Sequence, residues 1–169
     1  WPFWTFRFFL TFRGGVRKIA PMNLKNVLTK ETVALGLSGT DKAAIIGELL
    51  DTLMKTGKVA DRERALSSIL ERERKMSTGM KHAIAIPHGK TDTVTDLVAC
   101  VGVSKAAVDF DALDGKPCRI FIMTLSPADK TGPHLQFLAE VSLLFKSEEK
   151  RATILAARTP EEVIAALTE

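Results

Sequence analysis

Two histidines carry the clearest potential for chemistry in this chain. His88 follows Pro87 directly after a short apolar run, and Gly89 lets the backbone turn beside it. His134 lies 46 residues later, at the start of a predicted helix that follows another apolar run. In open α/β sheets functional residues gather at the carboxyl ends of strands. A neutral imidazole, with a reference pKa of about 6.5, can attack phosphorus at pH 7.

Arg72 and a polar loop could complete an anion site around these histidines. Arg72 lies near the end of the predicted helix before the central loop, and its guanidinium can hold phosphoryl oxygens in its fork. The loop residues Ser77, Thr78 and Gly79 add hydroxyl groups and a pliable backbone. Phosphoryl transfer needs mainly positioning and charge neutralisation from a protein. The pattern therefore predicts a phosphoryl site with His88 as the nucleophile.

Each of these residues also has a simpler interpretation. His88 could be a loop residue without a role, and His134 could merely cap its helix. A metal-dependent hydrolase that uses His82, His88 and His134 is a further alternative, although the chain has no obvious carboxylate-bearing motif to complete such a site. Nucleotide chemistry is not indicated, because neither G-x-G-x-x-G nor G-x-x-x-x-G-K-[ST] occurs.

Alternating strands and helices must bring these side chains together. Apolar runs that end at proline, glycine or polar residues predict buried strands at 32–35, 83–86, 97–103 and 118–125. Capping residues and helical spacing predict helices after Asp41, over 62–75, from Pro133, and over 148–157 and 160–167. Because the strands are apolar on both sides, we expect an α/β fold with a mixed or mostly parallel sheet, mostly buried between helices.

The first 21 residues differ from the rest of the chain. They hold seven of the eleven aromatic residues and four basic residues without an acid, so residues 22–169 are neutral although the 169-residue chain has a net charge of +4. We expect residues 1–21 to be a non-native, upstream or flexible leader, with Met22 as the natural start and residues 22–169 as one domain. The alternative is that residues 1–21 are an amphipathic targeting or membrane-surface segment. The neutral domain argues against nucleic-acid binding, and no apolar run reaches the roughly 18 residues of a membrane span.

From Met22 to Glu169 the chain resembles the IIA domain of the fructose, mannitol and nitrogen-regulatory type in the bacterial phosphoenolpyruvate-dependent sugar phosphotransferase system. The residues that carry the resemblance are Arg72-Glu73, Ser77-Thr78-Gly79, Ile84-Ala85-Ile86-Pro87-His88-Gly89 and Pro133-His134-Leu135. The spacing is specific, because the Arg-Glu pair begins sixteen residues before His88 and the second histidine lies 46 residues after it. The chain departs from the family at residues 80–83, where members often have glycine-rich sequences.

The resemblance implies a phosphocarrier with a phosphohistidine intermediate. His88 is expected to accept a phosphoryl group on Nε2 from an HPr-like phosphocarrier and to pass it to a IIB component during sugar uptake and phosphorylation. His134 is expected to orient or stabilise the phosphoryl group, and Arg72 to neutralise its charge. Support is expected from Ser77, Thr78, Gly79 and Gly89. The alternative is a nitrogen-type regulatory protein, in which the phosphorylation state of His88 controls binding to other proteins.

The same resemblance implies a mixed sheet of about five strands with helices on both faces. It implies no metal and no organic cofactor. We also expect no nucleic-acid partner, no direct insertion into a membrane and a cytoplasmic location. The sugar, the downstream acceptor and the oligomeric state stay open at this point.

Overall fold

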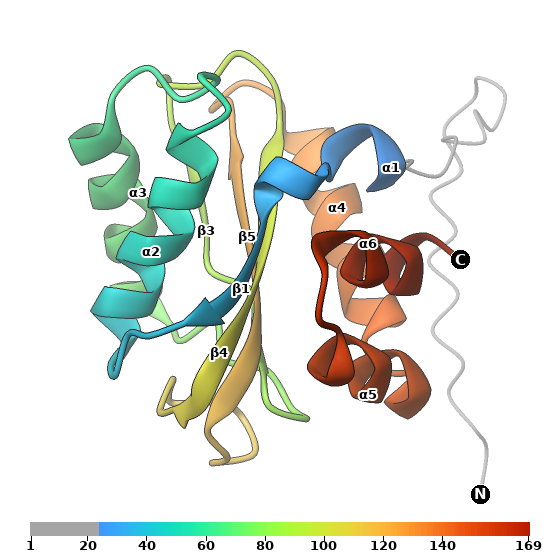
Figure 1. Cartoon of the computed structure of the whole chain (residues 1–169). Coiled ribbons are helices and arrows are strands. Elements are labelled where there is room, and N and C mark those ends of the chain that lie inside the picture. The colour runs from blue at the N-terminus through green and yellow to red at the C-terminus, as the bar shows by residue number, and fades with distance from the viewer. Residues whose placement is uncertain (1–23) are drawn as a thin grey trace, which may run out of the picture.

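A mixed β-sheet separates two layers of helices (Figure 1). The structure is a computed structural model that describes residues 24–169, so the expected leader at 1–21 and Met22 lie outside the described residues. Within the described part, the sheet has five strands: β1 Val33–Leu37, β2 Ile84–Ala85, β3 His88–Lys90, β4 Val98–Val108 and β5 Cys118–Ser126. Their order is β1-β4-β5-β2, and β3 also pairs with β5. Only the β4–β5 pairing is antiparallel among the described strands, which confirms the expected mixed sheet.

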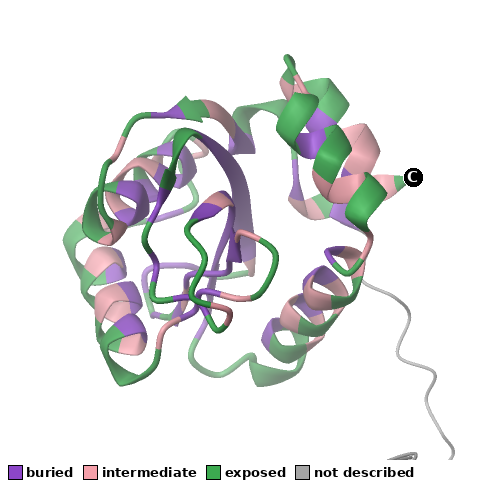
Figure 2. Cartoon of the chain, turned by 90° about the horizontal axis from the view of Figure 1, so that it is seen from below, coloured by how far each residue is buried: buried purple, intermediate pink, exposed green. Residues whose placement is uncertain are grey.

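The two helical layers bury opposite faces of the sheet. One layer contains α2 Lys42–Met54 and α3 Arg62–Lys75. The other contains α1 Leu24–Val27, α4 Thr131–Leu144, α5 Glu148–Ala156 and α6 Pro160–Thr168, and a short 3₁₀ helix at Lys30–Thr32 leads into β1. Figure 2 shows buried residues along the strands and on the inner sides of the helices, with exposed residues outside. The predicted α/β fold is therefore confirmed.

Strand β5 shows how the two cores arise from one sequence. Its side chains alternate between the faces, because successive residues of a strand point in opposite directions. Phe121 and Met123 pack in the core beneath α2 and α3. Ile120 and Ile122 pack in the core beneath α4 to α6. With both faces buried, the strand reads as a continuous apolar run in the sequence.

The predicted helix starts are confirmed by their capping bonds. The Asp41 side chain accepts a hydrogen bond from the backbone amide of Ala44 at 2.8 Å, and Asp61 accepts one from the amide of Arg64 at 3.0 Å. Each carboxylate satisfies an amide that has no partner within its own helix. These caps fix where α2 and α3 begin, and α3 carries Arg72 in its last turn.

The central strand does end before Pro87, since β2 stops at Ala85, but the prediction that the chain leaves the sheet at His88 is wrong. Pairing with β5 is interrupted at Ile86 and Pro87 and resumes at His88, which pairs with Thr124 inside β3. Pro87 has no amide proton to donate, but its carbonyl still accepts from the Thr124 amide at 3.1 Å. The missing donor falls in the interruption between β2 and β3, where there is no regular strand pairing to lose. His88 consequently lies along the outer edge of the sheet rather than beyond a strand end.

Two other strand boundaries also differ from expectation. The strand predicted to stop before Gly36 continues to Leu37, with an irregular register between Leu35 and Leu37. Gly36 has a φ of 79°, a conformation that glycine adopts without steric cost and that suits such an irregularity. The strand predicted to end at Val103 extends to Val108. Among residues 24–169, no helix has both the length and the apolar character needed to cross a membrane.

Candidate functional site

A groove runs along the outer edge strand β3, between α3 on one side and α4 on the other. Its volume is about 620 Å³. The lining residues are Ser68, Glu71, Arg72 and Lys75 of α3, His88, Gly89 and Lys90 of β3, and His134, Leu135 and Leu138 of α4. The tertiary structure thus brings Arg72, His88 and His134 into one groove, from three separate elements.

His88 has one ring nitrogen engaged by the backbone. Its Nδ1 lies 2.7 Å from the carbonyl oxygen of Ile86. A carbonyl can only accept, so Nδ1 carries the proton and Nε2 keeps its lone pair in the neutral ring. The pKa of His88 is lowered, mainly by burial. The hydrogen bond to Ile86 acts in the opposite direction, and the charge of Arg72 lowers the pKa further. The ring is therefore neutral at pH 7, with Nε2 available as a nucleophile.

His134 lies beside His88 and is held by a buried serine. The two ring centroids are 5.4 Å apart and the ring planes are inclined at 56°. His134 Nδ1 lies 2.8 Å from Ser126 Oγ. Ser126 is fully buried, and His134 Nδ1 is the acceptor within reach of its hydroxyl among the described residues. The hydroxyl therefore donates to Nδ1, which leaves Nε2–H of His134 as a donor for an anion in the groove.

Arg72 supplies positive charge from the last turn of α3. Its Nη1 donates to the carbonyl oxygen of Met76 at 2.8 Å, which leaves the other guanidinium donors for a ligand. Its charge lowers the pKa of both histidines. Arg74 behaves differently, because its Nε donates back to the Leu70 carbonyl and its side chain does not line the groove.

Ser77, Thr78 and Gly79 do not line the groove. The Ser77 hydroxyl donates to the carbonyl of Phe110 at 2.5 Å, and the Thr78 hydroxyl donates to Glu73. Their backbone instead forms an irregular edge to β2: the Thr78 carbonyl accepts from the Ile86 amide at 3.0 Å, and Gly79 bridges to Ala85. These residues therefore hold the segment before His88 through backbone pairing and are not placed to contact an anion in the groove.

Sequence reasoning did not assign roles to Ser126 and Lys90. Ser126 orients His134, which lies eight residues later in the sequence. The two side chains meet only because α4 packs against the end of β5. Lys90 follows His88 by two residues in β3 and lies in the same groove, where its Nζ donates to Thr131 Oγ1 at 2.8 Å. Two-residue spacing in a strand is a usable signal for a shared face, but it requires that 88–90 be recognised as a strand.

The alternative metal site is not assembled. His82 lines a separate pocket with Ile84 and Phe145, away from the groove that holds His88 and His134. Within residues 24–169, no group of three or more histidine, cysteine, aspartate or glutamate residues is arranged to hold a metal ion.

Gly89 allows α3 to approach β3 closely, and we expect Gly89→Ala to destabilise the protein. A Cβ atom at this position would lie 2.8 Å from Ser68 Oγ and 3.2 Å from the backbone nitrogen of Ile69. Relief of this overlap requires a shift of α3, at a cost of about 1–3 kcal/mol in the free energy of unfolding, measurable by urea titration. Gly132→Ala is the matched control, since a Cβ there meets no atom within 4 Å. Equal stability of the two variants would contradict the close packing at Gly89.

The pKa of His134 predicts a pH-dependent stability. Burial, followed by the charges of His88, Lys90 and Arg72, lowers this pKa to about 4. The unfolded chain, with a histidine pKa of about 6.5, binds more protons than the folded one between these two values, so stability falls as pH falls through this window. Between pH 7 and pH 5 the wild type should lose about 2 kcal/mol more unfolding free energy than His134→Gln. Parallel losses in denaturant titrations at the two pH values would contradict the assignment.

The comparisons with known proteins agree with this fold. Residues 26–169 match the family described as "Phosphoenolpyruvate-dependent sugar phosphotransferase system, EIIA 2". The chain belongs to this family, which confirms the resemblance noted in the sequence. It is therefore an EIIA domain of type 2, a phosphotransferase component of that system.

Relatives include two fructose-specific proteins. The chain is 36% identical over 143 residues to the fructose-specific EIIABC component of Bacillus subtilis (strain 168), covering 85% of this chain and 22% of that protein. It is 35% identical over 147 residues to the fructose-specific EIIA component of Haloferax volcanii, covering 87% of this chain and 96% of that protein. The chain thus spans about a fifth of the first relative and nearly all of the second.

A solved structure with the same fold belongs to a nitrogen regulatory protein. The crystal structure of the nitrogen regulatory protein IIA-Ntr from Neisseria meningitidis superposes with a TM-score of 0.81 at 27% identity. The match covers 86% of this chain and 99% of that one. Similarity to both sugar-specific and regulatory relatives agrees with the two functional alternatives that the sequence suggested.

Proposed function

We propose that His88 carries the phosphoryl group in this EIIA domain, in the cytoplasm. Nε2 accepts it from the phosphorylated histidine of an HPr-like phosphocarrier and hands it to a IIB component during sugar uptake. The observation that carries the proposal is the hydrogen bond from His88 Nδ1 to the Ile86 carbonyl, which leaves the Nε2 lone pair free in a groove shared with Arg72 and His134. The proposal uses no metal ion and no organic cofactor.

The transfer step follows from this geometry. The Nε2 lone pair of His88 forms a bond to phosphorus as the donor nitrogen–phosphorus bond breaks, and the donor imidazole leaves with that electron pair. Arg72 neutralises the charge of the phosphoryl oxygens, and the Nε2–H of His134 donates a hydrogen bond to one of them. The same contacts hold the phosphoryl group on His88 until the nucleophile of the IIB component attacks it.

The experiment is a reconstituted relay. Purified chain is mixed with phosphoenolpyruvate labelled with ³²P, enzyme I and HPr, and labelling is followed with and without a fructose-type IIB component. We expect label that is stable in base and lost in acid, as a phosphorus–nitrogen bond requires, and that moves to IIB when IIB is added. Absence of label with active enzyme I and HPr would refute the phosphocarrier assignment.

The second candidate is a nitrogen-type regulatory role, favoured by the close superposition on the Neisseria meningitidis protein. Both candidates phosphorylate His88 and differ in which protein responds to the modification. Affinity capture with the phosphorylated and the unphosphorylated chain separates them. A phosphate-dependent partner that accepts no label supports regulation, whereas a partner that takes up label supports the relay.

We also propose that the domain does not need residues 1–21. The family match begins at residue 26, and the described fold begins with α1 at Leu24. Deletion of residues 1–21 should leave the thermal midpoint and the labelling rate of the remaining chain unchanged, as followed by circular dichroism and the relay assay. Loss of cooperative unfolding in the shortened chain would show instead that this segment belongs to the domain.

A further inference from the structure

A buried carboxylate lies in the last turn of α3, beside Arg72 but outside the groove. Glu73 is only 7% exposed. Its two oxygens lie 3.0 Å and 3.2 Å from the backbone nitrogen of Thr78, which donates to them, and the Thr78 hydroxyl donates as well. Lys42 Nζ forms an ion pair with Glu73 at 3.0 Å. A buried charge is retained only when it is paired and hydrogen-bonded in this way.

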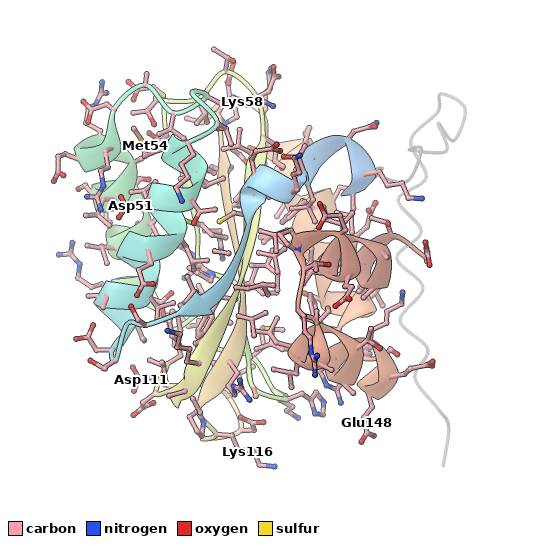
Figure 3. The ribbon with its side chains drawn as sticks, viewed as in Figure 1. Asp51, Met54, Lys58, Asp111, Lys116 and Glu148 are labelled. Atoms are coloured by element: carbon pink, nitrogen blue, oxygen red, sulfur yellow. The ribbon has the colours of Figure 1, made fainter. Side chains whose placement is uncertain are left out.

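Lys42 extends this cluster to a second part of the fold. It is the first residue of α2, and its Nζ also binds Asp111 at 2.8 Å and lies 5.1 Å from the ring centroid of Phe110. Figure 3 shows Asp111 at the lower end of the molecule, below α2. Glu73 therefore ties together the start of α2, the end of α3, the loop that contains Thr78, and the connection between β4 and β5.

From Glu73 a series of hydrogen bonds leads to His88. The amide of Thr78 donates to Glu73, and the carbonyl of Thr78 accepts from the amide of Ile86 at 3.0 Å. The carbonyl of Ile86 then accepts from His88 Nδ1 at 2.7 Å. Each carbonyl in the series is thus oriented by the bond before it. The last bond is the one that determines which nitrogen of His88 is protonated.

The stability of α3 does not explain why a carboxylate is present at position 73. A carboxylate in the last turn of a helix faces the negative end of the helix dipole, which is unfavourable, and the other ionised groups of this turn are the basic residues Arg72, Arg74 and Lys75. Glu71, two residues earlier, is exposed and pairs with Lys75 at the surface. The burial and the contacts of Glu73 are therefore tertiary, and they are directed to Thr78 and Lys42.

We propose that Glu73, held by Lys42, is a positioning residue for His88. Its carboxylate fixes the pairing of Thr78 with Ile86, and this pairing holds the Ile86 carbonyl where it keeps the proton of His88 on Nδ1 and leaves Nε2 free. The phosphoryl part of this inference rests on the proposed function, whereas the link from Glu73 to the protonated nitrogen does not. Glu73 touches neither the phosphoryl group nor the groove.

The experiment compares Glu73→Gln with Glu63→Gln, the same change at an exposed position in the first turn of the same helix. A glutamine NH₂ at position 73 cannot accept from Thr78 or Lys42. In ¹⁵N spectra at pH 8, the side chain of His88 should show protonated Nδ1 in the wild type and in Glu63→Gln, and an average of both tautomers in Glu73→Gln. The single-turnover rate of phosphoryl acceptance in Glu73→Gln should fall about tenfold at an unchanged half-saturating concentration of phosphorylated HPr.

Thr78→Val tests the same link with a milder change, since it removes only the hydroxyl bond to Glu73. Thr78→Val should change the ¹⁵N signals of the His88 side chain in the same direction, but by less. If Glu73→Gln does not fold, Thr78→Val alone tests the proposal. Unchanged His88 nitrogen signals in both folded variants would overturn the proposal, whatever the rate does. A tautomer shift in a chain whose wild type takes no label would support the positioning link and refute the phosphocarrier function, so the two failures are distinguishable.

Discussion

His88→Asn should reduce phosphorylation to background, a loss of more than about a thousandfold in the single-turnover rate. The asparagine amide can still donate to the Ile86 carbonyl, so the local backbone keeps its partner, but no nucleophilic nitrogen remains where Nε2 was. The measurement is transfer of ³²P from labelled HPr to the purified variant, quenched at times from milliseconds to minutes.

His82→Asn is the matched control for this prediction. His82 is the histidine nearest to His88 in the sequence, but it is exposed and lines a different pocket. Its backbone has a φ of 67°, which asparagine tolerates better than most residues, so the control should fold. Labelling should proceed at the wild-type rate in His82→Asn. Persistent label in His88→Asn, or loss of label in His82→Asn alone, would show that His88 is not the phosphorylated residue.

His134→Ala should still accept phosphate, at a rate about ten- to a hundredfold below the wild type. The expected loss is that of one preorganised donor to the transferring group, because the nucleophile and Arg72 stay in place. Onward transfer to IIB should slow as well, since the same donor stabilises the phosphoryl group when it leaves. Both rates are measured by rapid quench with labelled HPr and with the labelled variant plus IIB.

Ser126→Ala distinguishes orientation of His134 from its mere presence. Without the serine hydroxyl, Nδ1 of His134 has no donor, and the ring can place its proton on either nitrogen. The rate of phosphate acceptance should fall several-fold, less than in His134→Ala. Wild-type kinetics in His134→Ala would remove this residue from the site, and wild-type kinetics in Ser126→Ala alone would show that the serine does not determine the tautomer.

Elements of this protein with a strong local signal were predicted from the sequence. The caps at Asp41 and Asp61 and the apolar spacing of α3 depend on residues within one or two helical turns, so they predicted these helices without knowledge of the fold. Continuous apolar runs predicted buried strands and hence a sheet covered on both faces. The residue types and spacing of Arg72, His88 and His134 indicated phosphoryl chemistry, and their side chains do meet in one groove.

Only the tertiary structure decided how those groups are oriented. Whether the chain leaves the sheet at Pro87 depends on the carbonyl that this residue offers to Thr124, 37 positions away, as their hydrogen bond shows. The loop of Ser77 and Thr78 has an anion-binding composition, yet its hydroxyls are taken by Phe110 and Glu73. Local sequence determines which backbone conformations are favoured, whereas burial and pairing between distant segments determine where each polar group finds its partner, and in this protein that choice decides which histidine nitrogen is free.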